Sequence, residues 1–349
     1  MSRKFFTEFA KTGKRAPVAA HLVLHEKPNH DEILLNGDLL GKVTEETARR
    51  FGLPFAIPIM DLVIEKETIL DALGVAPENR NTFHFDELPD DSVWQKIEAH
   101  DFKSHPRTKA NLISLNYIAT KTDLLPVDMS IGPFSLLTKM MSDPIIPIYL
   151  AGNGLTKEDA PEVALVEKIS EIATNTVLKS LKIKIAGGAK AIFLCEPAAN
   201  LVYFSPKQMD EGSDVFDRYV IEPNRKVKEL LDKHGVSLIL HDCGDLRPVM
   251  AQKLAALRPD VFSFGSPVKL WEMEPFVDKD IVMYGNMPTK KFYSDVEISL
   301  DAVVKLAKEI IEKMTATGHP FILGSECDVL SMPGYEKTIR EKVNAFCAL

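Results

Sequence analysis

Short apolar runs recur along this 349-residue chain, and each is followed by loop residues and then by a stretch with helical spacing. This alternation is typical of βα units whose strands pair in parallel. Eight runs have this form: residues 17–24, 55–60, 126–131, 191–195, 236–240, 261–264, 281–284 and 321–323. Eight strands in one chain favour a closed α/β barrel, the (β/α)8 TIM barrel, over an open sheet.

The stretches between the runs predict helices that end at glycine. Residues 41–51, 159–186 and 217–234 have helical spacing, and each is followed by a glycine that can terminate a helix. The segment 75–120 is longer and more polar, which predicts an insertion between strands 2 and 3 that caps one barrel end. With an N-terminal helical extension and no repeat or linker, we expect one domain over residues 1–349.

The charge balance restricts the possible partners. The formal net charge is -8 and 45% of the residues are hydrophobic, so a large core is expected and attraction to nucleic acid is not. The chain has no apolar run of about 18 residues that could cross a membrane. The basic N-terminal stretch is interrupted by Glu8 before it could form a signal peptide. We therefore expect a cytoplasmic protein with no nucleic-acid or membrane partner.

Three residues at predicted strand ends form a candidate metal site. His241 and Cys243 follow the fifth run, and Cys327 follows the eighth. Both loops open at the C-terminal end of a barrel, so the three side chains should lie close together. Two thiolates and an imidazole favour Zn²⁺, and a fourth position would remain for water or substrate. The alternative is that these are ordinary buried residues, as we expect for Cys195 and Cys347.

Polar or small residues follow other predicted strands as well. They are Asp61, Gly132, Glu196 and Asn286. Barrel enzymes draw their sites from such positions, so these four residues are candidates for lining a ligand cavity at the barrel mouth. Each could instead be a helix cap or a loop residue.

These residues together resemble a known family. Met60-Asp61, Gly132-Pro133-Phe134-Ser135, Glu196-Pro197, His241-x-Cys243-Gly244 and Cys327 occur in the order found in the uroporphyrinogen decarboxylase superfamily. Within it, the chain resembles the zinc-dependent methylcobamide:coenzyme M methyltransferases. The resemblance implies that a methyl group moves from a corrinoid, carried by a separate corrinoid protein, to a zinc-bound thiol such as coenzyme M. His241, Cys243 and Cys327 would act through the zinc, and Asp61 and Glu196 would position the substrate.

Two features bear on which branch of the superfamily the chain resembles. The decarboxylases carry an arginine-rich segment near the first strand, but residues 17–27 contain no arginine, which disfavours tetrapyrrole decarboxylation. Methyltransferases of this branch can carry an acidic fourth ligand after the sixth strand, where this chain has Ser266 and Pro267. The fourth ligand could then be water, Glu272, Glu274 or Glu326. Transfer to tetrahydrofolate, or a non-catalytic corrinoid-binding protein with structural zinc, remains an alternative.

Overall fold

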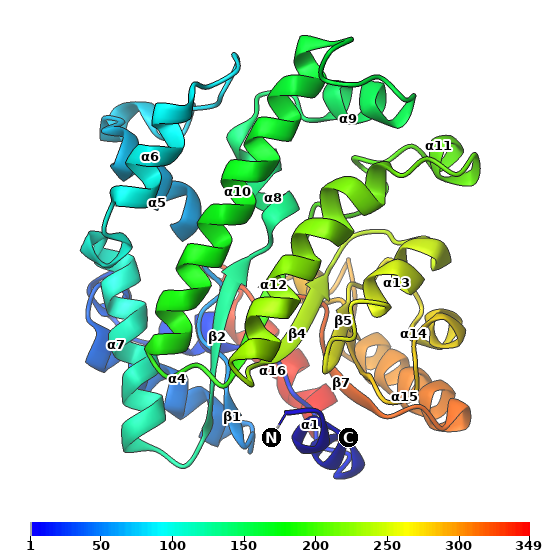
Figure 1. Ribbon diagram of the computed structural model, residues 1–349. Coiled ribbons are helices and arrows are strands. Elements are labelled where there is room, and N and C mark those ends of the chain that lie inside the picture. Colours follow the sequence, from blue (N-terminus) through cyan, green and yellow to red (C-terminus); the bar gives the residue numbers. More distant parts are fainter. Residues whose placement is uncertain (1) are drawn as a thin grey trace.

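The fold is a TIM-barrel-type α/β fold, as predicted. The computed structural model describes residues 2–349, and its seven strands are parallel and pair in chain order. They are β1 (Phe55–Ala56), β2 (Leu125–Ile131), β3 (Ala191–Cys195), β4 (Ser237–Asp242), β5 (Val261–Phe264), β6 (Val282–Met287) and β7 (Phe321–Ser325). Figure 1 shows helices packed around the outside of the curled sheet, with both chain termini at one end and α9 and α11 at the other.

Helices connect the strands and form the outer layer. The longer ones are α1 (Ser2–Lys11), α4 (Gly37–Arg50), α5 (Ile64–Leu73), α6 (Asp91–Ala99), α7 (Pro106–Lys121), α8 (Pro133–Met140), α9 (Ile145–Gly152), α10 (Pro161–Ala186), α12 (Glu222–Lys233), α13 (Pro248–Ala255), α15 (Leu300–Thr317) and α16 (Glu336–Cys347). The short ones are α2 (Ala20–Leu24), α3 (His30–Leu34), α11 (Pro206–Asp210) and α14 (Leu270–Met273), with single turns η1 (Pro77–Asn79), η2 (Phe102–Ser104), η3 (Asp217–Ile221), η4 (Glu274–Phe276) and η5 (Thr289–Lys291).

The predicted first strand, residues 17–24, is wrong. Ala16 forms a single parallel bridge with Gly324 of β7, and the chain turns into helix α2 at Ala20. Pro17 has no N–H to donate to a sheet, and the apolar residues that follow are buried without alternation, a pattern that fits a helix as well as a strand. The Tyr284 hydroxyl donates a 2.5 Å hydrogen bond to the Ala16 carbonyl and so holds this extended segment beside β7.

The predicted insertion contains one helix of the regular outer layer. Helix α7 packs along α4 and leads directly into β2, so it belongs to the barrel. The added elements are α6 and the short turns η1 and η2 that flank it. In Figure 1, α5 and α6 lie beside the upper part of α10, toward the end where the strands finish.

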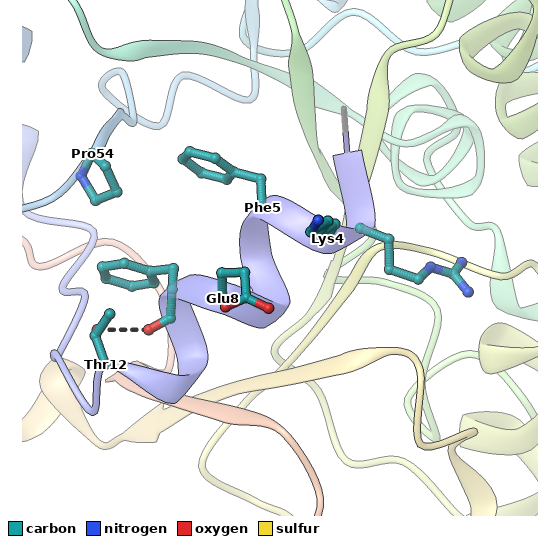
Figure 2. Close-up of a pocket in the computed structure, with 7 residues that line it drawn as sticks. Lys4, Phe5, Glu8, Thr12 and Pro54 are labelled. Atoms are coloured by element: carbon teal, nitrogen blue, oxygen red, sulfur yellow. Dashed lines mark hydrogen bonds between the residues drawn. The ribbon is translucent and has the colours of Figure 1, made fainter.

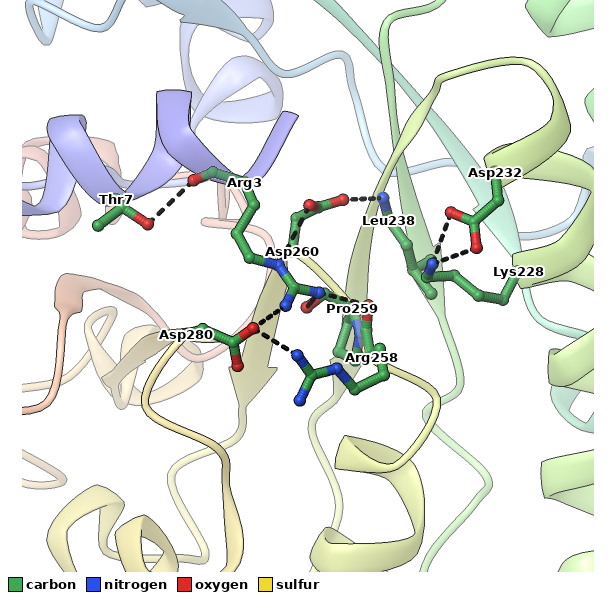
Figure 3. A network of polar contacts seen from close by, with 9 residues as sticks. All are labelled: Arg3, Thr7, Lys228, Asp232, Leu238, Arg258, Pro259, Asp260 and Asp280. Atoms are coloured by element: carbon green, nitrogen blue, oxygen red, sulfur yellow. Dashed lines mark hydrogen bonds and ion pairs between the residues drawn. The ribbon is translucent and has the colours of Figure 1, made fainter. Parts of the chain in front are cut away.

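Helix α1 covers the N-terminal end of the barrel. Its Phe9 ring meets Phe55 of β1 edge-on, with centroids 5.0 Å apart. Arg3 pairs with Asp280 and donates a 2.9 Å hydrogen bond to the Arg258 carbonyl, which ties the helix to the loops before β5 and β6 (Figure 3). A surface groove of about 740 Å³ runs along α1, lined by Phe5, Phe9 and Pro54 among others (Figure 2). Because barrel enzymes react at the opposite end, we place the functional site away from this groove.

Candidate metal centre

The structure brings His241, Cys243 and Cys327 together at the C-terminal end of the strands. One ligand atom from each lies within 4.8 Å of the others, and residues 2–349 contain no second group of three potential ligands that converges in this way. His241 lies in β4, Cys243 follows that strand, and Cys327 lies two residues after β7. Strands far apart in the sequence therefore deliver the three ligands to one point.

The imidazole of His241 is oriented as a metal ligand requires. Register pairs His241 with Ser263 on β5, and its Nδ1 lies 2.8 Å from the Ser263 hydroxyl oxygen. The tautomer that donates from Nδ1 leaves the Nε2 lone pair free, and buried Nε2 has no hydrogen-bond partner in the protein. Metal-bound histidines usually have this arrangement, with one nitrogen held by a neighbour and the other on the metal. The donor set therefore fits zinc.

Burial and neighbouring groups shift the pKa values of the two thiols in opposite directions. The neighbouring Cys327, then His241 and Lys290, lower the pKa of Cys243 against the opposing effect of burial. The neighbouring Cys243 and burial raise the pKa of Cys327, whose sulfur lies 3.7 Å from the Met60 sulfur. The lowered pKa of Cys243 favours its thiolate, the form that binds metals, and metal binding would release the protons that remain on the two sulfurs.

The acidic candidates for a fourth ligand have other partners. Glu272 pairs with Lys269 at 3.0 Å, and Glu274 pairs with Lys279 at 3.1 Å. Glu326 is buried, and its Oε2 accepts a 2.6 Å hydrogen bond from the Ser266 hydroxyl. None of the three belongs to the converging group described for residues 2–349.

Asp61 and Asn286 hold neighbouring segments in place. Asp61 is partly buried after β1 and forms an ion pair with Arg107 of α7. The Asn286 amide donates to the carbonyl oxygens of Gly265 and Val268, at 2.8 and 2.7 Å. These bonds fix the loop between β5 and α14, which follows the strand paired with β4. Asn286 lies at the end of β6 as predicted, whereas β1 ends at Ala56 and not at residue 60, so Asp61 lies in the loop beyond it. The contacts that both residues make are with the protein itself.

Glu196 does not line an open cavity, contrary to expectation. It is fully buried and accepts hydrogen bonds from the backbone N–H groups of Phe134 and Ser135, at 3.1 and 2.8 Å. Asn224 of α12 donates a third bond of 2.7 Å. The carboxyl therefore caps the N-terminus of α8, where backbone N–H groups attract an anion. A Cβ atom on Gly132 would lie 2.1 Å from the Glu196 carboxyl carbon, so this residue must be glycine for Glu196 to fit.

The close approach of Gly132 to Glu196 predicts that adding a single methyl group at residue 132 destabilises the fold. We expect Gly132→Ala to lower the free energy of unfolding by about 1–3 kcal/mol, because the buried carboxyl has no room to retreat. Gly187→Ala is the matched control, since its Cβ would meet neighbours at 3.3 Å. Urea unfolding of both variants measures the difference. Equal stabilities for the two variants would contradict this account of Gly132.

Three histidines stack beside the loop that carries Cys327. The rings of His21 and His25 are 4.3 Å apart, and those of His25 and His30 are 4.4 Å apart. His21 Nδ1 accepts a 3.1 Å hydrogen bond from the Ser331 N–H. Burial, then the charges of His25 and His30, lower the pKa of His21 to about 4. The folded protein therefore requires neutral His21, whose lone pair holds residue 331 in place.

The lowered pKa of His21 predicts that the folded protein loses stability in acid. Because the folded protein binds this proton less readily than the unfolded chain, the contribution of His21 to stability is present above pH 6.5 and declines as the pH falls toward about 4. In His21→Asn, whose amide oxygen can accept the same bond, the decline between these pH values should be shallower. Unfolding curves at several pH values test this, with exposed His234→Gln as the control. Identical pH profiles of the unfolding free energy for His21→Asn and the unmodified protein would contradict this role of His21.

One charged neighbour of the thiols was missed by the sequence analysis. Lys290 follows β6 in η5, and its charge contributes to the lowered pKa of Cys243. The sequence predicted that this strand ends at residue 284, whereas β6 continues to Met287. Lys290 therefore lies nearer to the strand end than the pattern indicated. A search for polar residues a few positions farther along would have found it.

The fold and this site can be set against known proteins. The uroporphyrinogen decarboxylase (URO-D) family model matches residues 19–346, so the chain belongs to this family. The predicted superfamily is thereby confirmed. Among solved structures, a methyltransferase from Methanosarcina mazei is similar, with a TM-score of 0.69 and 18% sequence identity over 99% of this chain and 98% of that one. That likeness shows the shared fold.

Two further searches gave negative results. A search of curated proteins found no match to this sequence. Within residues 2–349, no helix combines the length and apolar character needed to cross a membrane.

Proposed function

We propose that this chain is a zinc-dependent methyltransferase that moves a methyl group between a corrinoid, bound to a separate corrinoid protein, and a thiol such as coenzyme M. The observation that carries the proposal is the convergence of one imidazole nitrogen and two sulfurs at the C-terminal end of the barrel. The methyltransferase name of the similar archaeal structure supports the same function.

The residues of the site have distinct tasks in this proposal. Bound here, zinc would supply Lewis acidity that keeps an acceptor thiol ionised at neutral pH. His241 would ligate through Nε2 while Ser263 fixes its ring, and Cys243 and Cys327 would balance the charge of the ion. Three protein ligands leave a coordination position for the acceptor, as in catalytic zinc sites.

A thiol-dependent demethylation assay tests the proposal. Purified zinc-loaded protein is mixed with methylcobalamin and, in parallel, with coenzyme M, other small thiols or tetrahydrofolate. We expect spectral loss of methylcobalamin and an S-methyl product with at least one thiol, and no reaction after chelation of the metal. Methyl transfer to tetrahydrofolate and to none of the thiols would show that the acceptor is tetrahydrofolate and not a thiol.

A decarboxylase and a non-catalytic zinc protein would give different results. Decarboxylation of uroporphyrinogen by metal-free protein would establish a tetrapyrrole decarboxylase instead. Tightly held zinc without turnover on any acceptor would favour a binding protein with a structural metal.

A further inference from the structure

One buried side chain joins three loops at the C-terminal end of the strands. Glu326 directly follows β7 and precedes Cys327. Its Oε2 accepts hydrogen bonds from the hydroxyl and the backbone N–H of Ser266, at 2.6 and 3.3 Å. Its Oε1 accepts a 3.3 Å bond from the backbone N–H of Lys290. The carboxylate of Glu326 therefore ties together the segments that follow β5, β6 and β7.

Cys327 depends on such contacts more than the other two ligands of the candidate metal centre. His241 is part of β4 and pairs in register with β5. Cys327 lies instead in residues 326–335, which connect β7 to α16 through bends and turns. The backbone N–H of Glu326 donates to the Met287 carbonyl of β6 at 2.8 Å. Beyond that bond, the contacts of neighbouring side chains determine where the Cys327 sulfur lies.

The position of a ligand before the metal arrives affects how tightly the metal binds. A site whose ligands already lie close together loses less conformational entropy when the ion binds. Residues that hold the ligands without touching the metal typically change its affinity about 10- to 100-fold. Glu326 contributes no atom to the converging group found within residues 2–349, so any effect it has on a metal must pass through Cys327.

We propose that Glu326 is a positioning residue that holds the sulfur of Cys327 ready for metal binding by joining the loops after β5 and β6 to its own. The inference rests on the metal centre of the proposed function. Without the carboxylate, the segment that carries Cys327 would be free to move away from His241 and Cys243, and the metal would have to order it again.

Zinc affinity tests this role without a corrinoid or an acceptor thiol. The full-length chain is stripped of metal, and its affinity for zinc is measured by competition with a chromophoric chelator. We expect Glu326→Ala to weaken zinc binding by about 10- to 100-fold. Glu326→Gln keeps an oxygen that can accept the 2.6 Å bond from Ser266, so it should lose less affinity than Glu326→Ala.

Two further variants separate positioning from a general loss of stability. Asp260 is also a buried carboxyl that accepts a backbone N–H, from Leu238 at 3.0 Å, but it lies at the opposite end of the strands (Figure 3). Asp260→Ala should lower the thermal unfolding temperature and leave zinc affinity unchanged. Ser266→Ala should weaken zinc binding in the same direction as Glu326→Ala, and it replaces that variant in the test if Glu326→Ala does not fold.

The possible outcomes distinguish this inference from the proposed function. Zinc affinity in Glu326→Ala equal to that of the unmodified protein would overturn the inference, as would an equal loss in Asp260→Ala. A loss in Glu326→Gln as large as in Glu326→Ala would also overturn it. Failure of the unmodified protein to bind zinc would overturn the metal centre and this inference with it. Zinc binding without methyl transfer would refute the proposed function alone.

Discussion

If the proposed zinc centre is correct, replacing Cys327 by serine is expected to abolish zinc binding. A serine hydroxyl stays protonated at neutral pH, so it cannot replace the thiolate that completes the group with His241 and Cys243. Loss of residues that merely orient metal ligands costs about 10- to 100-fold in affinity, so loss of a ligand should cost at least about 100-fold. Metal analysis after dialysis should then show zinc well below about one ion per chain.

Cys347 provides the matched control for this substitution. It ends α16, and burial followed by the opposing charge of Arg15 sets its pKa at about 12, so it is a protonated thiol outside the ligand group. Cys347→Ser should retain the zinc content of the unmodified protein. Retention of zinc by Cys327→Ser would show that the sulfur of Cys327 is not a ligand, and loss of zinc from Cys347→Ser as well would show that zinc content does not report on ligation by Cys327.

The ligand group could be predicted because it depends on strand order alone. In a parallel barrel all strand ends face one way, so His241, Cys243 and Cys327 could be expected at the same end of the barrel once their strands were recognised. Their separation along the chain was no obstacle, since β4 and β7 finish at the same end of the barrel.

Other parts of the structure depend on contacts that no local pattern encodes. Glu196 follows a strand like a site residue, yet its role is set by the close approach of α8 that Gly132 permits. The predicted first strand failed for a related reason, because burial on all sides removes the alternation that distinguishes strand from helix. Lys290 was missed because the end of β6 is fixed by its pairing with β7.

The second large effect is a loss of stability, expected when the buried ion pair between Glu65 of α5 and Lys184 of α10 is broken. The Lys184 ammonium donates to Glu65 Oε1 at 2.9 Å and to the Met129 carbonyl at 2.5 Å, and both charged side chains are buried. Lys184→Met would leave Glu65 as a buried charge without a cation. Such losses cost about 3–5 kcal/mol of unfolding free energy, which urea unfolding can measure.

Removing both charges should restore part of that stability. In Glu65→Gln/Lys184→Met, the neutral amide can still accept the hydrogen bonds that Ser130 and Ser180 now donate to Glu65, at 3.0 and 2.9 Å. Neither member of this ion pair would then be left charged without its partner, so the double variant should be more stable than Lys184→Met alone. Lys228→Met, which breaks an ion pair with exposed Asp232, should cost under about 1 kcal/mol. If Lys184→Met costs no more than Lys228→Met, or the double variant is the less stable, the effect of Lys184 comes from packing and not from charge.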